Sequence, residues 1–349
     1  MNKQNDIIWI DWVKFICIFF VYWCHVAQLG SNVSPINIPY GFFFVNAFFF
    51  VSGYLIFSKQ MGENEIGCNV KEFWNKNIDG RGMCPNIIFK IAIPSVIFSI
   101  IDYIPKVMIS GGEMSFWMFF YETFLRGTNW FTCALTISEI IIFILLLTRL
   151  KKIHYYLLFG VAIAMIGKYL QDSNYLILEN KYLPWFYKGG MIATIFLVIG
   201  GMFQKYEKKF DDLLLGRGKI LLSLIYIILY YFTPLGKEKA SVLNNISWLG
   251  FGMSLLSIMA IIYVCKQFKQ VRIVKFISRH TIGFYFLSAS IPYVWTKIVE
   301  HFLPLSNFAF FLCLALSFVS AIISVYLLNR YLPFLFDLRI LFRKKKKHC

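Results

Sequence analysis

Long apolar runs alternate with short polar segments along the whole chain, and ten of the runs predict membrane-spanning helices. A spanning helix needs about 20 mostly apolar residues. The predicted spans cover residues 8–29, 36–58, 86–108, 129–149, 153–170, 183–204, 218–235, 246–266, 281–302 and 308–332. The longest segment between them is too short for a soluble domain. We therefore expect residues 1–349 to form a single integral-membrane domain, an all-α polytopic helix bundle.

The distribution of Lys and Arg predicts how this bundle is oriented. If the N-terminus is cytoplasmic, about three-quarters of the 35 Lys and Arg residues fall on inner segments. Positive charge gathers on the cytoplasmic side of membrane proteins, so both termini are predicted to be cytoplasmic. The basic tail Arg343–His348 is interpreted as part of this topology signal. The expected location is the plasma membrane of a bacterial cell, with the protein crossing it many times.

Composition agrees with a membrane protein and excludes several other classes. The chain is 58% hydrophobic and 15% charged, which is too apolar for a soluble protein of 349 residues. The net charge of +17 is assigned to inner loops beside anionic lipid, so no nucleic acid partner is expected. The eight cysteines form no CxxC pair, and neither a disulfide framework nor a metal site is predicted.

The first predicted span carries a line of polar residues. Lys14 and His25 are eleven residues apart, close to three helical turns, so they share one face about 16 Å apart along the axis. Asp11 and Gln28 fall near the same line. A polar line on an apolar helix is expected to face the bundle interior or a wet cavity. The alternatives are that Lys14 snorkels to the inner headgroups beside Asp11, and that His25 only fills an interface.

Several segments, in order along the chain, resemble the acyltransferase-3 family of integral-membrane O-acyltransferases. "IDWVKFICIFFVYWCH" is similar to its opening, a basic residue and ten further residues before His, with Lys14 in place of the commoner Arg. "FFFVSG", "FKIAIPS", "NWFTCAL" and "FISRHTIGFYFLSASI" resemble later family segments. Ser288 stands where many members carry a second His. Ten spans is also the usual count in this family.

The resemblance implies acyl transfer from a cytoplasmic acyl-CoA, acetyl-CoA by default, to a sugar hydroxyl of a surface polysaccharide or its lipid-linked precursor. The expected partners are therefore the acyl-CoA donor, a carbohydrate acceptor and the lipid bilayer. His25 is the candidate general base, since neutral imidazole titrates near the working pH. Lys14 is expected to bind donor phosphate, with Asp11 orienting it. Lys90 is either a further donor contact or an anchor at the inner interface.

Four other residues are candidates for lining the site, each with a structural alternative. Ser52 is interpreted first as a small residue that lets two helices approach closely. Glu139 lies in the middle of a span, so it is either paired for structure or placed at the site. Trp130 lines the acceptor path or belongs to the interfacial aromatic belt. Ser288 marks the place of the missing second histidine.

A second class of function also accommodates a polar cavity in a bundle of this kind. A transporter or flippase for glycan intermediates or acyl groups would use the same aromatic walls and an intramembrane Lys. Transporters more often contain two halves with matching broken helices, and no such repeat is visible here. A scaffold without activity would leave the polar line unexplained. The spacing of Lys14 and His25, together with the ordered segments, favours the enzyme.

Overall fold

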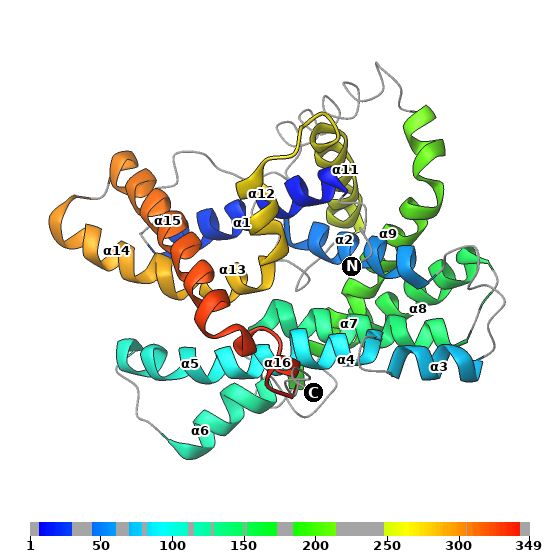
Figure 1. Ribbon diagram of the computed structural model, residues 1–349, viewed down its shortest axis with the longest axis horizontal. Coiled ribbons are helices and arrows are strands. Elements are labelled where there is room, and N and C mark those ends of the chain that lie inside the picture. The colour runs from blue at the N-terminus through cyan, green and yellow to red at the C-terminus, as the bar shows by residue number, and fades with distance from the viewer. Residues whose placement is uncertain are drawn as a thin grey trace, which may run out of the picture. The chain divides into compact units, whose positions relative to one another are not determined.

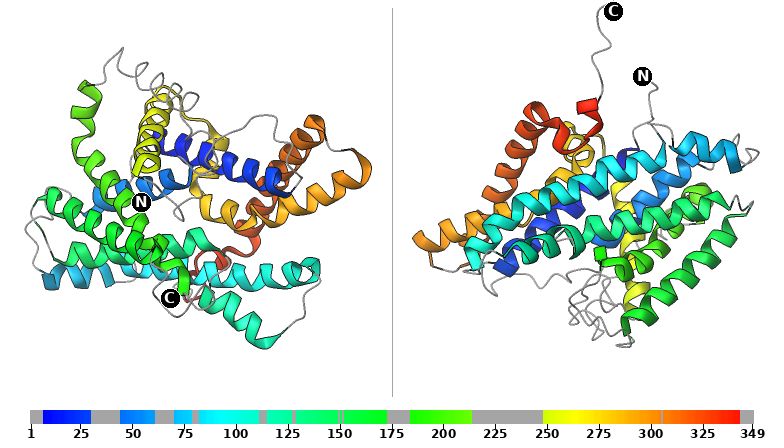
Figure 2. Two further views of the ribbon diagram at one scale, coloured as in Figure 1. Left: turned by 180° about the vertical axis from the view of Figure 1, so that it is seen from behind. Right: turned by 90° about the horizontal axis from the view of Figure 1, so that it is seen from below.

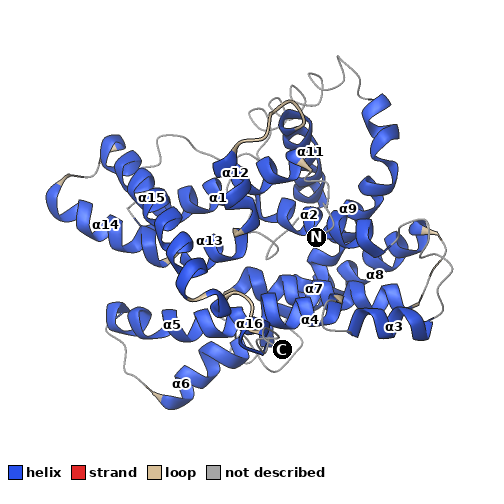
Figure 3. Cartoon of the chain, viewed as in Figure 1, coloured by secondary structure: helices blue, strands red, loops and turns tan. Residues whose placement is uncertain are grey.

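A computed structural model describes residues 7–29, 44–60, 70–78, 82–110, 115–126, 129–148, 150, 152–172, 184–213, 248–304 and 306–342. These residues form helices joined by turns, and none of them lies in a strand (Figure 3), which confirms the all-α prediction. The chain divides into two compact units. Unit 1 comprises Met1–Val51 and Tyr206–Tyr326, and unit 2 comprises Ser52–Lys205 and Leu327–Cys349. The single domain expected from the sequence stays a prediction.

Unit 1 is organised around its first helix. Its helices are α1 (Ile8–Leu29), α11 (Trp248–Cys265), α12 (Arg272–Arg279), α13 (Thr281–Leu287), α14 (Ser290–Phe302), the first part of α2 (Phe44–Gln60), the last part of α9 (Tyr187–Leu213) and most of α15 (Asn307–Tyr331). Helices α11 to α14 all contact α1 (Figures 1 and 2). The Phe318 ring lies 5.5 Å from Tyr22 and 5.8 Å from Phe19, joining α15 to α1.

Unit 2 contains the remaining helices and closely packed glycines. Its further elements are α3 (Val70–Ile78), α4 (Met83–Ile87), η1 (Ile88–Ala92), α5 (Ile93–Ser110), α6 (Phe116–Phe120), η2 (Tyr121–Arg126), α7 (Trp130–Leu147), α8 (Ile153–Asp172), η3 (Pro184–Phe186), η5 (Pro333–Leu335) and α16 (Arg339–Phe342). Gly53 of α2 lies so near Leu197 of α9 that a Cβ would overlap the Leu197 carbonyl group. Small residues allow such close approach of helix backbones in membranes.

Six described helical segments are long and apolar enough to cross a membrane. They are Ile8–Gln28, Trp74–Tyr103, Trp130–Leu147, Ile153–Gln171, Tyr187–Asp212 and Asn307–Tyr331. Two shorter apolar helices, Phe44–Lys59 and Gly250–Cys265, overlap the predicted spans 36–58 and 246–266. The predicted span 218–235 lies outside the described residues. The count of ten and the cytoplasmic termini therefore stay predictions.

Two predicted spans differ in detail from the observed helices. The continuous helix expected over 281–302 is instead α13 and α14, separated at Ser288 and Ala289. The Ser288 hydroxyl donates to the Tyr285 carbonyl at 2.7 Å, and the ring of Pro292 would clash with the Ser288 carbonyl in a continuous helix. The span at 86–108 contains the π-helical segment η1, which includes Lys90.

Candidate functional site

The face of α1 between Lys14 and His25 is covered by protein, whereas Gln28 at the end of the polar line is exposed. Lys14 and His25 are both half-buried. Ile18 and Val21 lie between them on the same face, at i+4 from Lys14 and i−4 from His25, and are 0% and 4% exposed. This face is therefore covered by protein rather than lipid, as the sequence predicted. None of the residues that the structure describes hydrogen-bonds the His25 imidazole, which leaves both ring nitrogens for other partners.

The N-terminal end of α1 is held by the segment that leads into α12. The Trp12 indole Nε1 donates to the Lys269 carbonyl at 2.9 Å, and its ring lies 4.8 Å from that of Phe268. Asp11 accepts a hydrogen bond from Gln270 Nε2 at 3.0 Å. The carboxylate of Asp11 thus helps to dock this segment, and its orienting role toward Lys14 stays a prediction.

A second hydrogen bond holds the middle of α1, and sequence reasoning missed it. The buried Tyr22 hydroxyl donates to the Phe284 carbonyl of α13 at 2.9 Å. Tyr22 is one turn before His25, so the bond fixes α13 beside the turn that carries the imidazole. The signal in the sequence was a tyrosine within an apolar, mainly aromatic run, since a buried phenol needs a partner for its hydroxyl.

In unit 2, two of the predicted lining residues pair with each other. The Ser52 hydroxyl of α2 donates to Oε1 of Glu139 in α7 at 2.5 Å. Glu139 is 8% exposed, so this bond provides a partner for a carboxylate deep in the protein. The close helix approach expected at Ser52 occurs one residue later, at Gly53.

A further polar cluster surrounds the start of α7, and the sequence did not suggest it. Ser95 and Thr132 share a hydrogen bond at 2.7 Å, and Asn129 Nδ2 donates to Ser99 Oγ at 3.2 Å. The neighbouring Trp130 is half-buried, with its ring 6.1 Å from Phe186. These bonds join α5 to the start of α7, next in sequence to Trp130, the residue predicted to line the acceptor path.

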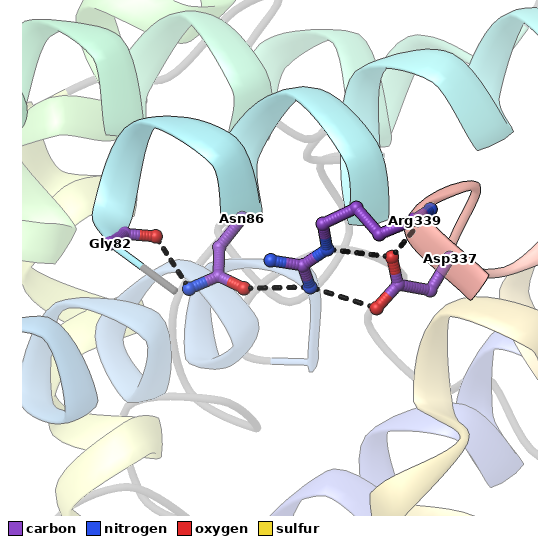
Figure 4. Close-up of polar contacts among 4 residues, drawn as sticks. All are labelled: Gly82, Asn86, Asp337 and Arg339. Carbon is purple, nitrogen blue, oxygen red and sulfur yellow. Dashed lines mark hydrogen bonds and ion pairs between the residues drawn. The ribbon is translucent and has the colours of Figure 1, made fainter. Parts of the chain in front are cut away.

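Lys90 acts electrostatically on the carboxylate of Asp337, which belongs to a hydrogen-bonded cluster of unit 2 (Figure 4). Arg339 donates from Nε and Nη2 to the two carboxylate oxygens of Asp337, both at 2.8 Å, and from Nη2 to Asn86 Oδ1 at 3.1 Å. Asn86 Nδ2 in turn donates to the Gly82 carbonyl. These Arg339 bonds lower the pKa of Asp337, and the charge of the exposed Lys90 lowers it further. The cluster ties the C-terminal segment to α4.

The Ser288 hydroxyl is used in a hydrogen bond to the backbone. It is 1% exposed, and its hydroxyl donates to the Tyr285 carbonyl at the end of α13. The position expected to carry a second histidine therefore terminates a helix here. Of the eight predicted site residues, Asp11, Lys14, His25 and Ser288 belong to unit 1, and Ser52, Lys90, Trp130 and Glu139 belong to unit 2.

Comparison with known proteins gives one clear finding. A family profile described as an acyltransferase domain, that of acyltransferase-3, matches residues 7–328. Neither the curated proteins nor the solved structures give a match to this chain. The matched range includes the whole of α1 and all eight predicted site residues.

Proposed function

The chain belongs to the acyltransferase-3 family and is a membrane acyltransferase, and from this premise we propose its reaction. It transfers an acyl group, acetyl first, from a cytoplasmic acyl-CoA to a sugar hydroxyl of a surface polysaccharide or its lipid-linked precursor. The observation that supports this best is the covered face of α1, which presents Lys14 and His25 about 16 Å apart. A lipid-facing or purely structural helix would not need both groups on that face.

His25 acts as the general base in this proposal. Its neutral imidazole takes the proton of the sugar hydroxyl while the hydroxyl oxygen attacks the thioester carbonyl carbon. The tetrahedral intermediate then collapses, the carbon–sulfur bond breaks, and CoA leaves with the proton that the imidazole returns to its sulfur. The ester forms on the sugar and His25 is neutral again. The open ring nitrogens of His25 are compatible with this cycle.

Lys14 binds the donor. Its ammonium is a point charge suited to phosphate, and it lies three turns nearer the predicted cytoplasmic end than His25. The separation of about 16 Å is of the order that an extended pantetheine arm bridges. The thioester then reaches His25 while the nucleotide end stays on the Lys14 side, where Asp11 shapes the local charge.

We assign supporting roles to the other candidates. Ser52 and Glu139 satisfy each other, so they hold α2 to α7. Lys90 neighbours the Asp337 carboxylate, which favours the anchoring role over donor contact. Trp130 is kept as a wall of the acceptor path. The family membership weighs against the transporter or flippase, because acyltransferase-3 is defined by group transfer.

Release of free CoA tests this proposal directly. Purified protein with acetyl-CoA should release CoA only when an acceptor glycan is added, and the ester should appear on the glycan. His25→Ala and Lys14→Ala should abolish the release, whereas Cys24→Ala, one residue from His25 on a different side of α1, should retain it. Normal membrane insertion with full activity in both site variants would contradict the mechanism. Movement of glycan across vesicles without ester formation would favour the carrier.

A further inference from the structure

Three aromatic side chains of unit 2 lie together where η3 meets the start of α7. The Trp130 ring is 6.1 Å from the Phe186 ring, and Trp185 precedes Phe186 in η3. All three side chains are half-buried, so each keeps part of its ring open. We call Trp130, Trp185 and Phe186 the η3 aromatic cluster, and it lies entirely within unit 2.

The backbone of η3 is held in a conformation that bulky residues avoid. Trp185 and Phe186 have φ values of 53° and 50°, and they are the non-glycine residues with positive φ in the part of the chain that the structure describes. Such a left-handed backbone crowds the Cβ and persists only where its surroundings enforce it, most often at functional sites. The Trp185 indole Nε1 donates to the Phe124 carbonyl at 2.7 Å. This bond and the strained backbone together fix the position of the two rings.

The η3 aromatic cluster also has hydrogen-bonding groups beside its rings. No described residue hydrogen-bonds the Trp130 Nε1, so this N–H is available to a ligand. The neighbouring Asn129 donates from Nδ2 to Ser99 Oγ at 3.2 Å and to the Ser95 carbonyl at 3.4 Å. These bonds orient the amide, and no described residue donates to its Oδ1. One open donor and one open acceptor therefore accompany the aromatic rings.

An interfacial aromatic belt does not explain this combination. A belt residue needs an apolar ring at headgroup level, but it needs no strained backbone. Trp117, which is 75% exposed on the regular helix α6, shows what a belt residue in this unit looks like. Lipid acyl chains have no hydrogen-bonding groups, so they would leave the Trp130 N–H and the Asn129 Oδ1 unused. A sugar ring has an apolar face of C–H groups and hydroxyls around its edge, which match the rings, the donor and the acceptor.

We propose that the η3 aromatic cluster binds a sugar ring of the acceptor glycan, which stacks on the aromatic rings and hydrogen-bonds Trp130 and Asn129. This assignment rests on the proposed function, because it takes the acceptor to be a carbohydrate. Trp130 and η3 stand at the predicted extracytoplasmic ends of the spans 129–149 and 183–204, the side on which a surface polysaccharide lies. The cluster positions one ring of the glycan and supplies no catalytic group.

The dependence of transfer on acceptor concentration tests the cluster. The probe is the cell's own surface polysaccharide, extracted and freed of esters by mild base, and its acetylation from acetyl-CoA is measured with full-length protein in nanodiscs. Trp130→Ala and Phe186→Ala should each raise the acceptor KM about tenfold, the loss expected for one stacked aromatic ring, with kcat and the acetyl-CoA KM unchanged. Trp130→Phe, which keeps a ring and removes the N–H, should show a smaller rise. Trp117→Ala is the matched control and should behave as wild type does.

The kinetic results separate the subsite from the belt. An unchanged acceptor KM in folded Trp130→Ala and Phe186→Ala would overturn the subsite and leave the proposed function standing. An equal rise in Trp117→Ala would also overturn it, because interfacial aromatic residues in general would then account for the effect. If size-exclusion profiles show that the alanine variants do not fold, the acceptor KM of Trp130→Phe decides in their place.

Direct binding of the same polysaccharide, measured without acetyl-CoA, separates the subsite from the reaction. Binding to wild type that weakens in the cluster variants, with no ester formed in the transfer assay, would support the subsite and overturn the proposed acyl transfer. Absence of both binding and transfer in wild type would overturn both proposals.

Discussion

Buried polar groups bond to one another in both units, as Asn46 and Ser254 do in unit 1, and the imidazole of His25 differs from them. In unit 2 they satisfy one another: Ser52 bonds to Glu139, and Ser95 bonds to Thr132. In unit 1 the covered face of α1 carries Lys14 and His25, and the described residues give the His25 imidazole no hydrogen bond. Polar groups inside a membrane protein are costly unless they are paired or serve a function. We therefore interpret the polar pairs of unit 2 as structural and keep His25 on α1 as the candidate for the chemistry.

The sharpest test of this division is the kinetics of variants on α1. His25→Asn should lower kcat about 10²- to 10⁴-fold, the usual contribution of a general base, with little change in the donor KM. Lys14→Gln should mainly raise the donor KM. Steady-state transfer assays with varied acetyl-CoA separate the two effects. An equal loss of kcat in both variants would indicate that α1 fails as a scaffold rather than as a site.

Glycine packing gives the next largest effect, and it should appear in unit 2. Gly53→Ala would place a Cβ on the Leu197 carbonyl, so we expect loss of folded protein in detergent. Gly252→Ala on α11 of unit 1 is the matched control, because nothing lies within 4 Å of its Cβ position. That variant should be neutral or more stable by up to about 1 kcal/mol. Thermal unfolding and size-exclusion profiles distinguish the two outcomes.

The Ser52–Glu139 bond should matter for stability more than for rate. Ser52→Ala leaves a buried carboxylate without this donor, at a cost of about 1–3 kcal/mol. Replacing both partners, as in Ser52→Ala with Glu139→Leu, should recover most of that stability because no buried polar group is left alone. Unfolding midpoints and transfer rates per folded molecule measure this. A lower transfer rate in a stable double variant would indicate that Ser52 and Glu139 contribute to the reaction itself.

The smallest effect is expected at the Asp337–Arg339 contact. Because the pKa of Asp337 is lowered in the folded protein, its ionised carboxylate stabilises the fold above the unfolded pKa of about 3.9. This stabilisation is lost as the pH falls through the pKa of the folded protein. Arg339→Gln should therefore reduce stability at pH 7 by about 0.5 kcal/mol and make no difference in acid. Unfolding midpoints between pH 3 and pH 7 measure it. Lys297→Gln, which removes the exposed Lys297–Glu300 pair of unit 1, should show no comparable pH-dependent difference.

The length of an apolar run predicted a span well where that run forms one uninterrupted helix. The prediction 8–29 matches α1 at Ile8–Leu29, and 308–332 matches α15 at Asn307–Tyr331 within a residue. The prediction of one helix over 281–302 failed, because hydropathy alone does not detect helix breaks. The break here comes from Ser288, whose hydroxyl donates to the Tyr285 carbonyl, and from Pro292, the third residue of α14. The prediction also missed α12, whose short apolar face spans too few residues to stand out as a helix.

The candidate site was predictable only within one helix. The spacing of Lys14 and His25 placed them on one face because helical periodicity relates residues of the same element. The partners of Tyr22, Ser52 and Asp11 are 262, 87 and 259 residues away in the chain, and no periodic pattern links such distant positions. The sequence therefore identified several of the polar groups, but their hydrogen-bond partners could be found only in the folded structure.

The π-helical segment η1 makes the third predicted span sensitive to its exact length. A π turn accommodates one residue more than an α turn, so everything after Ile88–Ala92 is rotated by about 100° relative to a regular helix. That rotation directs Ser95 toward Thr132 and Ser99 toward Asn129. Losing one residue here would keep the span apolar and long enough but turn both serines away. Sequence alignments that slide a gap freely through this segment would therefore pair the wrong faces of two helices.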